Sequence, residues 1–113
     1  MAMHEYEIIR NNVSKILEEN FPAFKYKGHG NNIGIWEIEE FQSLTKPFGD
    51  SFWSGRFRIW VFVPNQQGQQ IKIEVFLISV CEWETAFEGY IKDFNDIPEM
   101  LSYQFGLPKK DEK

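Results

Sequence analysis

Two consecutive strand-like segments constrain the fold most, because each carries apolar residues on both of its faces. In residues 56–63, one face presents Phe57, Ile59, Val61 and Val63, and the other presents Arg58, Trp60 and Phe62. In residues 70–81, one face presents Ile71, Ile73, Val75 and Leu77, and the other changes from Lys72 and Glu74 to Phe76 and Ile78. A sheet open to water on one side normally keeps that side polar. We therefore expect the second face to be covered, either by a helix of the same chain or by a second chain.

The segments before this hairpin combine one helical pattern with two short strand patterns. Apolar residues recur every three or four positions from Glu5 to Asn20, which predicts an amphipathic helix. We expect this helix to end before Pro22, because the residue preceding a proline is pushed out of the helical region. Residues 24–27 and 33–41 are predicted strands joined across the Gly- and Asn-rich turn at residues 28–32.

The last third of the chain returns to helical spacing. Thr85 and Glu88 fit a capping box that predicts a helix continuing through Phe94. A second helix start follows at residues 95–99, where Pro98 suits a first turn. The expected fold is an α+β single domain of order α-β-β-β-β-α-α. It has a mainly antiparallel sheet of about four strands, with an N-terminal helix and C-terminal helices. This domain spans residues 1–108, and residues 109–113 form a charged tail.

The composition limits the classes of partner. The chain has 113 residues, the size of one domain, with 17% aromatic residues and a formal net charge of -5. An acidic chain is a poor general nucleic-acid binder, because that affinity rests on Lys and Arg releasing counterions. The charge suits solubility or contact with a basic protein surface.

The compartment expected from the sequence is the reducing cytoplasm. Cys81 is the one cysteine, which excludes an internal disulfide framework and a multi-cysteine zinc site. The N-terminal "MAMHEYE" has no basic region followed by an apolar one, as a signal peptide would. No apolar run approaches the ~18 residues of a membrane span, so we expect no membrane partner.

Residues 49–51, Gly-Asp-Ser, resemble the block that carries the nucleophilic serine of the GDS lipases and esterases. The resemblance implies that Ser51 is a nucleophile, which requires a histidine base oriented by a carboxylate. That family supplies both from an Asp-x-x-His pair near the C-terminus of a longer α/β domain. Here the histidines are His4 and His29, and neither follows Ser51. We interpret this segment as a turn that leads into a strand.

A small enzyme or ligand-binding domain remains an alternative, with a site near His29, Ser51 and Glu37. His29 lies in "KYKGHGNN", which lacks the spacing of a phosphate-binding loop and reads as a hairpin turn. Glu37 and Glu39 share one strand face, but two carboxylates do not define a zinc site, which usually draws on Cys and His. We therefore predict no catalytic residue, no cofactor and no metal.

A second alternative is a single-stranded nucleic-acid binder. Arg58 and Trp60 lie in "FWSGRFRIW", and such proteins stack bases on rings and hold phosphates with arginine. Acidic residues of the same sheet, such as Glu74, interrupt this basic patch. Nucleic acid is therefore the less favoured partner, and a cation–π contact between Arg58 and Trp60 is the simpler interpretation.

The function favoured by the sequence is non-catalytic protein binding through an aromatic sheet face. Aromatic residues and arginine are enriched at protein interfaces. The residues expected to carry this binding are Trp53, Arg58, Trp60, Phe62 and Phe76. The partner is another protein of basic character, or a second copy in a homodimer. An acidic, aromatic-rich single domain without a catalytic set suits a small inhibitor of the immunity-protein type or a dedicated chaperone.

Overall fold

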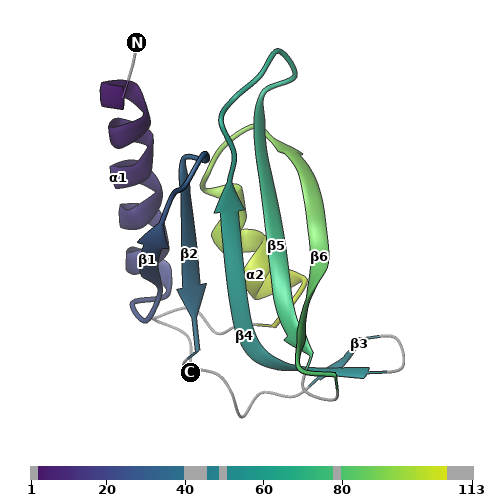
Figure 1. The fold of residues 1–113 in the computed structure, drawn as a ribbon. Helices are drawn as coiled ribbons and strands as arrows, with labels where there is room; N and C mark the ends of the chain where they lie inside the picture. The colour runs from purple at the N-terminus through teal and green to yellow at the C-terminus, as the bar shows by residue number, and fades with distance from the viewer. Residues whose placement is uncertain (1–2, 40–45, 49–50, 78–79, 107–113) are drawn as a thin grey trace.

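Two helices and six strands form the part of the chain that the computed structural model describes, residues 3–39, 46–48, 51–77 and 80–106 (Figure 1). Their order is α1 (Met3–Asn20), β1 (Lys25–Gly28), β2 (Gly34–Ile38), β3 (Lys46–Phe48), β4 (Ser51–Val61), β5 (Gln69–Leu77), β6 (Glu82–Ile91) and α2 (Asp96–Tyr103). The predicted α+β class, with a helix at each end of an antiparallel sheet, is confirmed. The domain boundary at residue 108 stays a prediction, and the tail at 109–113 lies outside the described residues.

The sheet is antiparallel at every described pairing and runs in the order β1-β2-β4-β5-β6, with β3 paired to the start of β4. Its register aligns Trp36, Ile59, Ile73 and Phe87 in one row across four strands. The central hairpin of β4 and β5 corresponds to the two segments predicted from their alternation. β1 and β6 are the two outer strands of this order.

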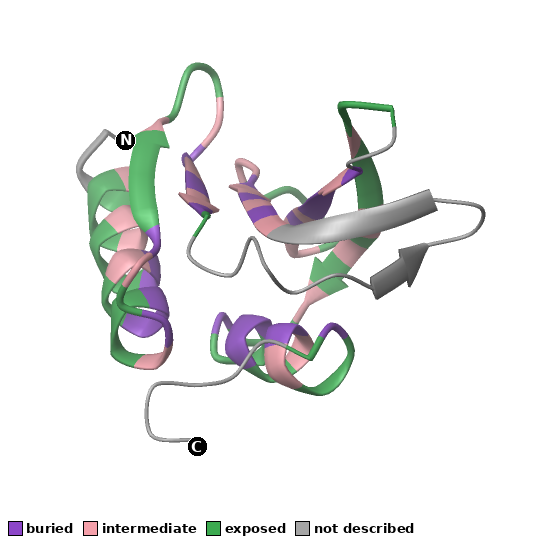
Figure 2. Ribbon diagram, turned by 90° about the horizontal axis from the view of Figure 1, so that it is seen from below, coloured by how far each residue is buried: buried purple, intermediate pink, exposed green. Residues whose placement is uncertain are grey.

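Both helices pack on the same face of the sheet, and the hydrophobic core lies between them and the strands. In Figure 2 the buried residues of α1 and α2 are turned toward the sheet. Trp36 of β2 is 1% exposed and donates from Nε1 to Ser14 Oγ of α1 at 3.0 Å. The Phe57 ring of β4 lies 5.8 Å from the Phe105 ring that follows α2. The two-layer arrangement therefore leaves the opposite face of the sheet without a described helix.

The N-terminal helix forms as its apolar spacing predicts. Val13, Ile16 and Leu17 are buried on its inner side. Its last turn is closed by Phe21 N–H, which donates to Leu17 O, and by the Asn20 side-chain amide, which donates to Ile16 O. These bonds satisfy carbonyls that a helix end otherwise leaves without partners.

The predicted helix beginning at Thr85 is wrong, because residues 82–91 form strand β6. The register between β5 and β6 shifts after Ile73 and Glu74, whose partners are Phe87 and Thr85. Ala86 is the extra residue of a β-bulge, and a bulge reverses which residues of a strand face each side. Phe87, Tyr90 and Ile91, which have helix-like spacing, all follow the bulge: Phe87 and Ile91 face the helices and Tyr90 faces the open side of the sheet. The second predicted helix start is confirmed, since α2 begins at Asp96.

Candidate functional site

The face of the sheet opposite the two helices is called the open face here. Its described side chains come from four neighbouring strands and from the residue after β4. They include Glu37 of β2; Arg56, Arg58 and Trp60 of β4; Phe62, which follows β4; Lys72, Glu74 and Phe76 of β5; and Trp83 of β6. The register places Glu37, Arg58 and Glu74 side by side, with Phe76 next to Trp83. Charged and aromatic side chains therefore alternate across this face.

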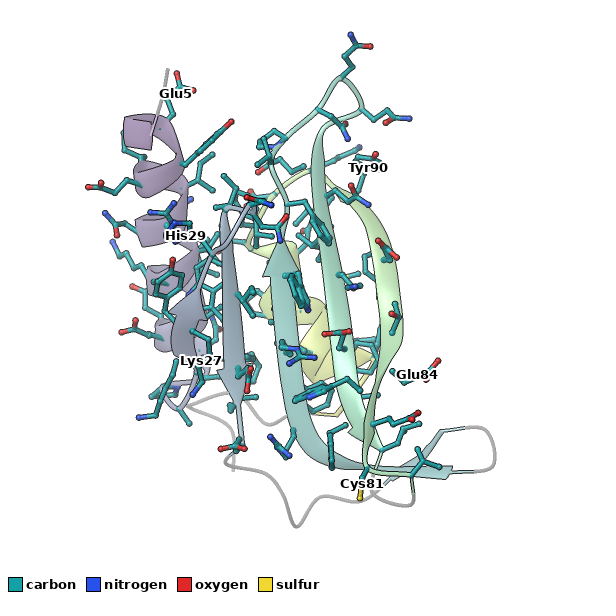
Figure 3. All side chains as sticks on the ribbon, viewed as in Figure 1. Glu5, Lys27, His29, Cys81, Glu84 and Tyr90 are labelled. Atoms are coloured by element: carbon teal, nitrogen blue, oxygen red, sulfur yellow. The ribbon has the colours of Figure 1, made fainter. Side chains whose placement is uncertain are left out.

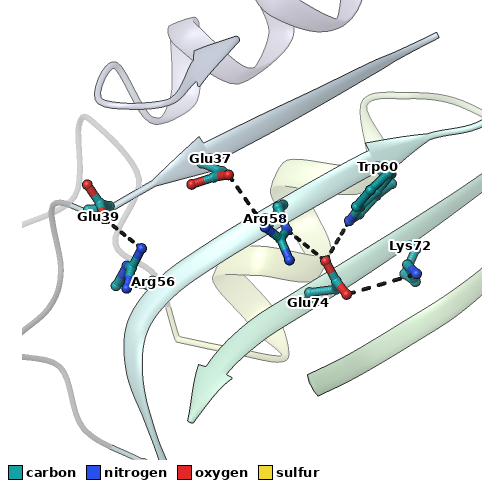
Figure 4. A network of polar contacts seen from close by, with 7 residues as sticks. All are labelled: Glu37, Glu39, Arg56, Arg58, Trp60, Lys72 and Glu74. Atoms are coloured by element: carbon teal, nitrogen blue, oxygen red, sulfur yellow. Dashed lines mark hydrogen bonds and ion pairs between the residues drawn. The ribbon is translucent and has the colours of Figure 1, made fainter. Parts of the chain in front are cut away.

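Glu74 is the centre of the polar contacts on the open face, and only 8% of its surface is exposed (Figure 4). Its Oε1 accepts hydrogen bonds from Arg58 Nε at 2.8 Å and from Trp60 Nε1 at 2.5 Å. Lys72 Nζ lies 3.9 Å from the other oxygen, Oε2. Arg58 also approaches Glu37, with Nη1 3.7 Å from Oε2. A nearly buried carboxylate is tolerated here because cationic and neutral donors replace its water.

Aromatic rings and arginine side chains stack on one another around this centre. The guanidinium carbon of Arg58 lies 4.1 Å from the centre of the Trp83 ring and 5.7 Å from that of Trp60. Arg56 lies 4.6 Å from the Phe76 ring and 5.2 Å from the Trp83 ring. Each of these distances is within the range of a cation–π attraction. The open face is thus a packed layer of side chains that shield one another from water.

One donor within this layer lacks an acceptor among the described residues. Arg56 Nη2 pairs with Glu39 Oε1 at 2.8 Å, whereas the buried Arg56 Nε has no hydrogen-bond partner in the part of the chain that the structure describes. Its neighbour Phe76 meets Trp83 edge to face, with ring centres 5.5 Å apart. On the open face, Glu74 Oε1 therefore accepts two hydrogen bonds, whereas Arg56 Nε donates none to a described residue.

Four of the five residues predicted for protein binding lie together on the open face: Arg58, Trp60, Phe62 and Phe76. Trp60 and Phe62 stack with ring centres 6.3 Å apart. The side chain of Trp53, the fifth, lies outside the described residues. Trp83 was missed because its segment was predicted as the approach to a helix. The sequence left open whether helices or another chain cover this face, and both described helices lie on the other side.

The residues proposed for an enzyme site do not come together. His29 lies in the β1–β2 turn, where its Nδ1 is hydrogen-bonded to the Tyr26 hydroxyl at 2.7 Å (Figure 3). This turn adjoins the end of β4 at Val61, which pairs with Gly34. Ser51 begins β4, an 11-residue strand, which corresponds to roughly 30 Å of extended chain. The side chain of Ser51 lies outside the described residues. The histidine and serine positions thus lie near opposite ends of β4.

Glu37 and Glu39 line a cleft of about 280 Å³ together with Ala23, Lys25 and Lys27. Both carboxylates are already engaged, Glu37 by Arg58 and Glu39 by Arg56. Among residues 3–39, 46–48, 51–77 and 80–106, no group of three or more His, Cys, Asp or Glu side chains is placed to hold a metal ion.

Comparison with protein-family models yields no match for this chain. Comparisons with curated proteins and with solved structures yield none either. Neither described helix combines the length and apolar character needed to span a bilayer.

Proposed function

We propose that the chain is a non-catalytic protein-binding domain that acts through the open face of its sheet. The observation that carries this proposal is the layer of four rings and three cations on the face opposite the helices. Trp and Arg are concentrated among the residues that supply most binding energy at protein interfaces. Side chains fixed by mutual contacts on a sheet also lose little conformational entropy when a partner docks.

The charges of the open face favour a protein over nucleic acid as the partner. Arg58 contacts Glu74 and Glu37, and Arg56 contacts Glu39. A phosphate would have to displace these carboxylates before it could pair with either guanidinium. A protein surface can instead match both signs of charge and pack apolar groups on the rings. The net charge of -5 supports a basic partner.

Two roles suit such a domain. One is a small inhibitor of the immunity-protein type that covers a basic partner, and the other is a chaperone that holds a client against the sheet. A homodimer through the open face is a third arrangement of the same surface. We place the domain in the cytoplasm, a location supported by its single cysteine, Cys81.

Quantitative affinity capture from an extract of the source cells tests the proposal. The bait is the whole chain, the test variant is Trp60→Ala, and the control is Ile8→Ala. Ile8 is an apolar residue on α1, 54% exposed and remote from the open face. Circular dichroism establishes that both variants are folded before capture.

We expect one protein or a small set to be depleted from the Trp60→Ala capture and retained by the control. The purified partner should then bind Trp60→Ala about tenfold or more weakly by calorimetry. Equal capture by all three baits, in a chain that is monomeric by sedimentation, would contradict the proposal. Salt-sensitive binding of a single-stranded oligonucleotide that is lost in Arg58→Ala would instead support the nucleic-acid alternative.

A further inference from the structure

Strand β6 ends the described sheet order and pairs with β5 alone (Figure 1). It is ten residues long, so its outer side offers a long row of backbone donors and acceptors. Such an edge is a template for another strand. The bulge at Ala86 divides this edge in two, and the half from Phe87 to Ile91 is regular.

A groove of about 490 Å³ lies beside this regular half of β6, between the strand and α2. Phe87, Ile91 and Met100 form its apolar floor and are partly buried against the core. Tyr103 of α2 lines the same groove and is 90% exposed. Tyr90 contributes to the rim of the groove, and its hydroxyl is hydrogen-bonded to Asn65 and Gln67 in the turn between β4 and β5. A strand added beside β6 would direct every second side chain toward this groove, because side chains alternate between the two faces of a sheet.

The negative charge of the protein is concentrated at the same edge. Residues 82–104 contain six acidic residues and one lysine, whereas the remainder of the chain has eleven acidic and eleven basic residues. Glu82 and Glu84 pair with Leu77 and Val75, so they lie on the helix side of the sheet. Glu88 pairs with Lys72 and lies on the open side. All three are exposed, and none takes part in an ion pair between described residues.

We propose that β6 binds an extended, basic segment of a partner protein as an additional antiparallel strand, the orientation of every described pairing in this sheet. Alternate apolar side chains of this segment enter the groove between β6 and α2, and its lysines or arginines, which point to the opposite face of the added strand, lie against Glu88. A second copy of the chain fits less well, because pairing β6 with itself brings glutamates together, which is destabilising. This site uses none of the residues assigned to protein binding on the open face, so either proposal can fail alone.

The probe that tests this proposal is a capped hexapeptide that alternates valine with lysine. Two further peptides carry N-methyl groups, one on the valine amides and the other on the lysine amides. N-methylation removes backbone donors along one edge of an extended peptide and leaves its charge unchanged. Binding is measured by fluorescence anisotropy, and hydrogen exchange reports protection of the β6 amides.

The protein variants separate local charge from net charge. Glu88→Lys reverses the charge on the open side of the edge, and the matched control Glu19→Lys reverses one exposed charge on α1. We expect the edge variant to bind the unmethylated peptide about threefold more weakly and the control to change little. Of the two methylated peptides, one should lose binding and the other should keep it, and residues 87–91 should gain protection.

Three results would overturn the proposal. Equal binding of both methylated peptides would show that backbone pairing is not involved. Equal losses in the edge variant and the α1 control would show general attraction to an acidic protein. A concentration-dependent dimer with protected β6 amides would make a second copy the occupant of the edge. Each of these results leaves the open-face proposal standing, because that proposal is tested with Trp60→Ala.

Discussion

Replacement of Glu74 by leucine should destabilise the fold more than any other single charge removal on the open face. The substitution retains an apolar stem of similar size and removes the acceptor shared by Arg58 and Trp60. Losing one partner of a buried ion pair costs about 3–5 kcal/mol. Arg58 is 22% exposed and keeps Glu37 at 3.7 Å, which lowers the cost. We expect a loss of about 2–3 kcal/mol in the free energy of unfolding.

Urea denaturation followed by tryptophan fluorescence and by circular dichroism measures this loss. For a domain of this size the same change corresponds to a melting temperature lower by about 10 °C. The control is Glu39→Leu, because Glu39 pairs with Arg56 while its side chain is 54% exposed. Such an exposed pair contributes about 0–1 kcal/mol.

The double variant Arg58→Met/Glu74→Leu tests the cause of the loss. It removes both charges, so it should recover more than half of the stability lost in the single variant, as apolar replacements of buried ion pairs often do. A Glu74→Leu variant as stable as Glu39→Leu would refute the reasoning. So would a double variant less stable than Glu74→Leu, since the charge left on Arg58 would then not be the cause.

Three further predictions concern other parts of the fold. Trp83→Ala should lower the free energy of unfolding by about 2 kcal/mol in chemical denaturation, because its ring contacts two arginines and a phenylalanine. Gly34→Ala should cost about 1–3 kcal/mol in the same assay, since the added Cβ would lie 2.5 Å from a ring atom of the buried Trp36; unchanged stability would contradict this packing. The backbone N–H of Asn95 and, to a lesser extent, its side-chain amide donate hydrogen bonds to Asp93, and these bonds hold the pKa of Asp93 below its usual range. The stabilisation of the fold by ionised Asp93 is therefore present above the ordinary aspartate pKa and is lost as the pH falls through the lowered pKa. NMR titration of the Asp93 carboxyl group measures this pKa, and the pH dependence of unfolding should be weaker in Asp93→Asn.

The helices and strands that could be predicted are those whose apolar residues keep a single spacing, either that of a helix or that of a strand, along the whole element. The stripe from Val13 to Leu17 has helical spacing only, and β4 has strict alternation from Phe57 to Val61. β6 could not be identified because its large apolar residues lie on both faces, Trp83 and Tyr90 on the open side and Phe87 and Ile91 on the helix side, so no alternation is visible in the sequence. Thr85 and Glu88 have the spacing of a capping box, which predicted a helix start. They lie in strand β6, because the same two residue types can stand three positions apart in a strand.

The candidate site was predicted where its residues lie on strands with regular alternation, and it was missed where they lie on β6. Arg58, Trp60 and Phe76 were found together because even-numbered positions of two paired strands face the same way. Trp83 was missed because the sequence does not show that β6 pairs with β5. The groove beside β6 was missed for the same reason, since it requires a strand where a helix was expected.

The uneven distribution of charge also affects how a partner would approach. Outside residues 82–104, the eleven acidic and eleven basic residues cancel in net charge. The net negative charge of the protein therefore comes from residues 82–104, which form β6 and α2 at one edge of the sheet. A cationic molecule would be oriented toward that edge during diffusion, before any contact forms. Charges are screened over about 8 Å at physiological ionic strength, so the edge orients a cationic partner only when the two molecules are within about that distance. Its signature would be an association rate that falls steeply with added salt while the dissociation rate changes little.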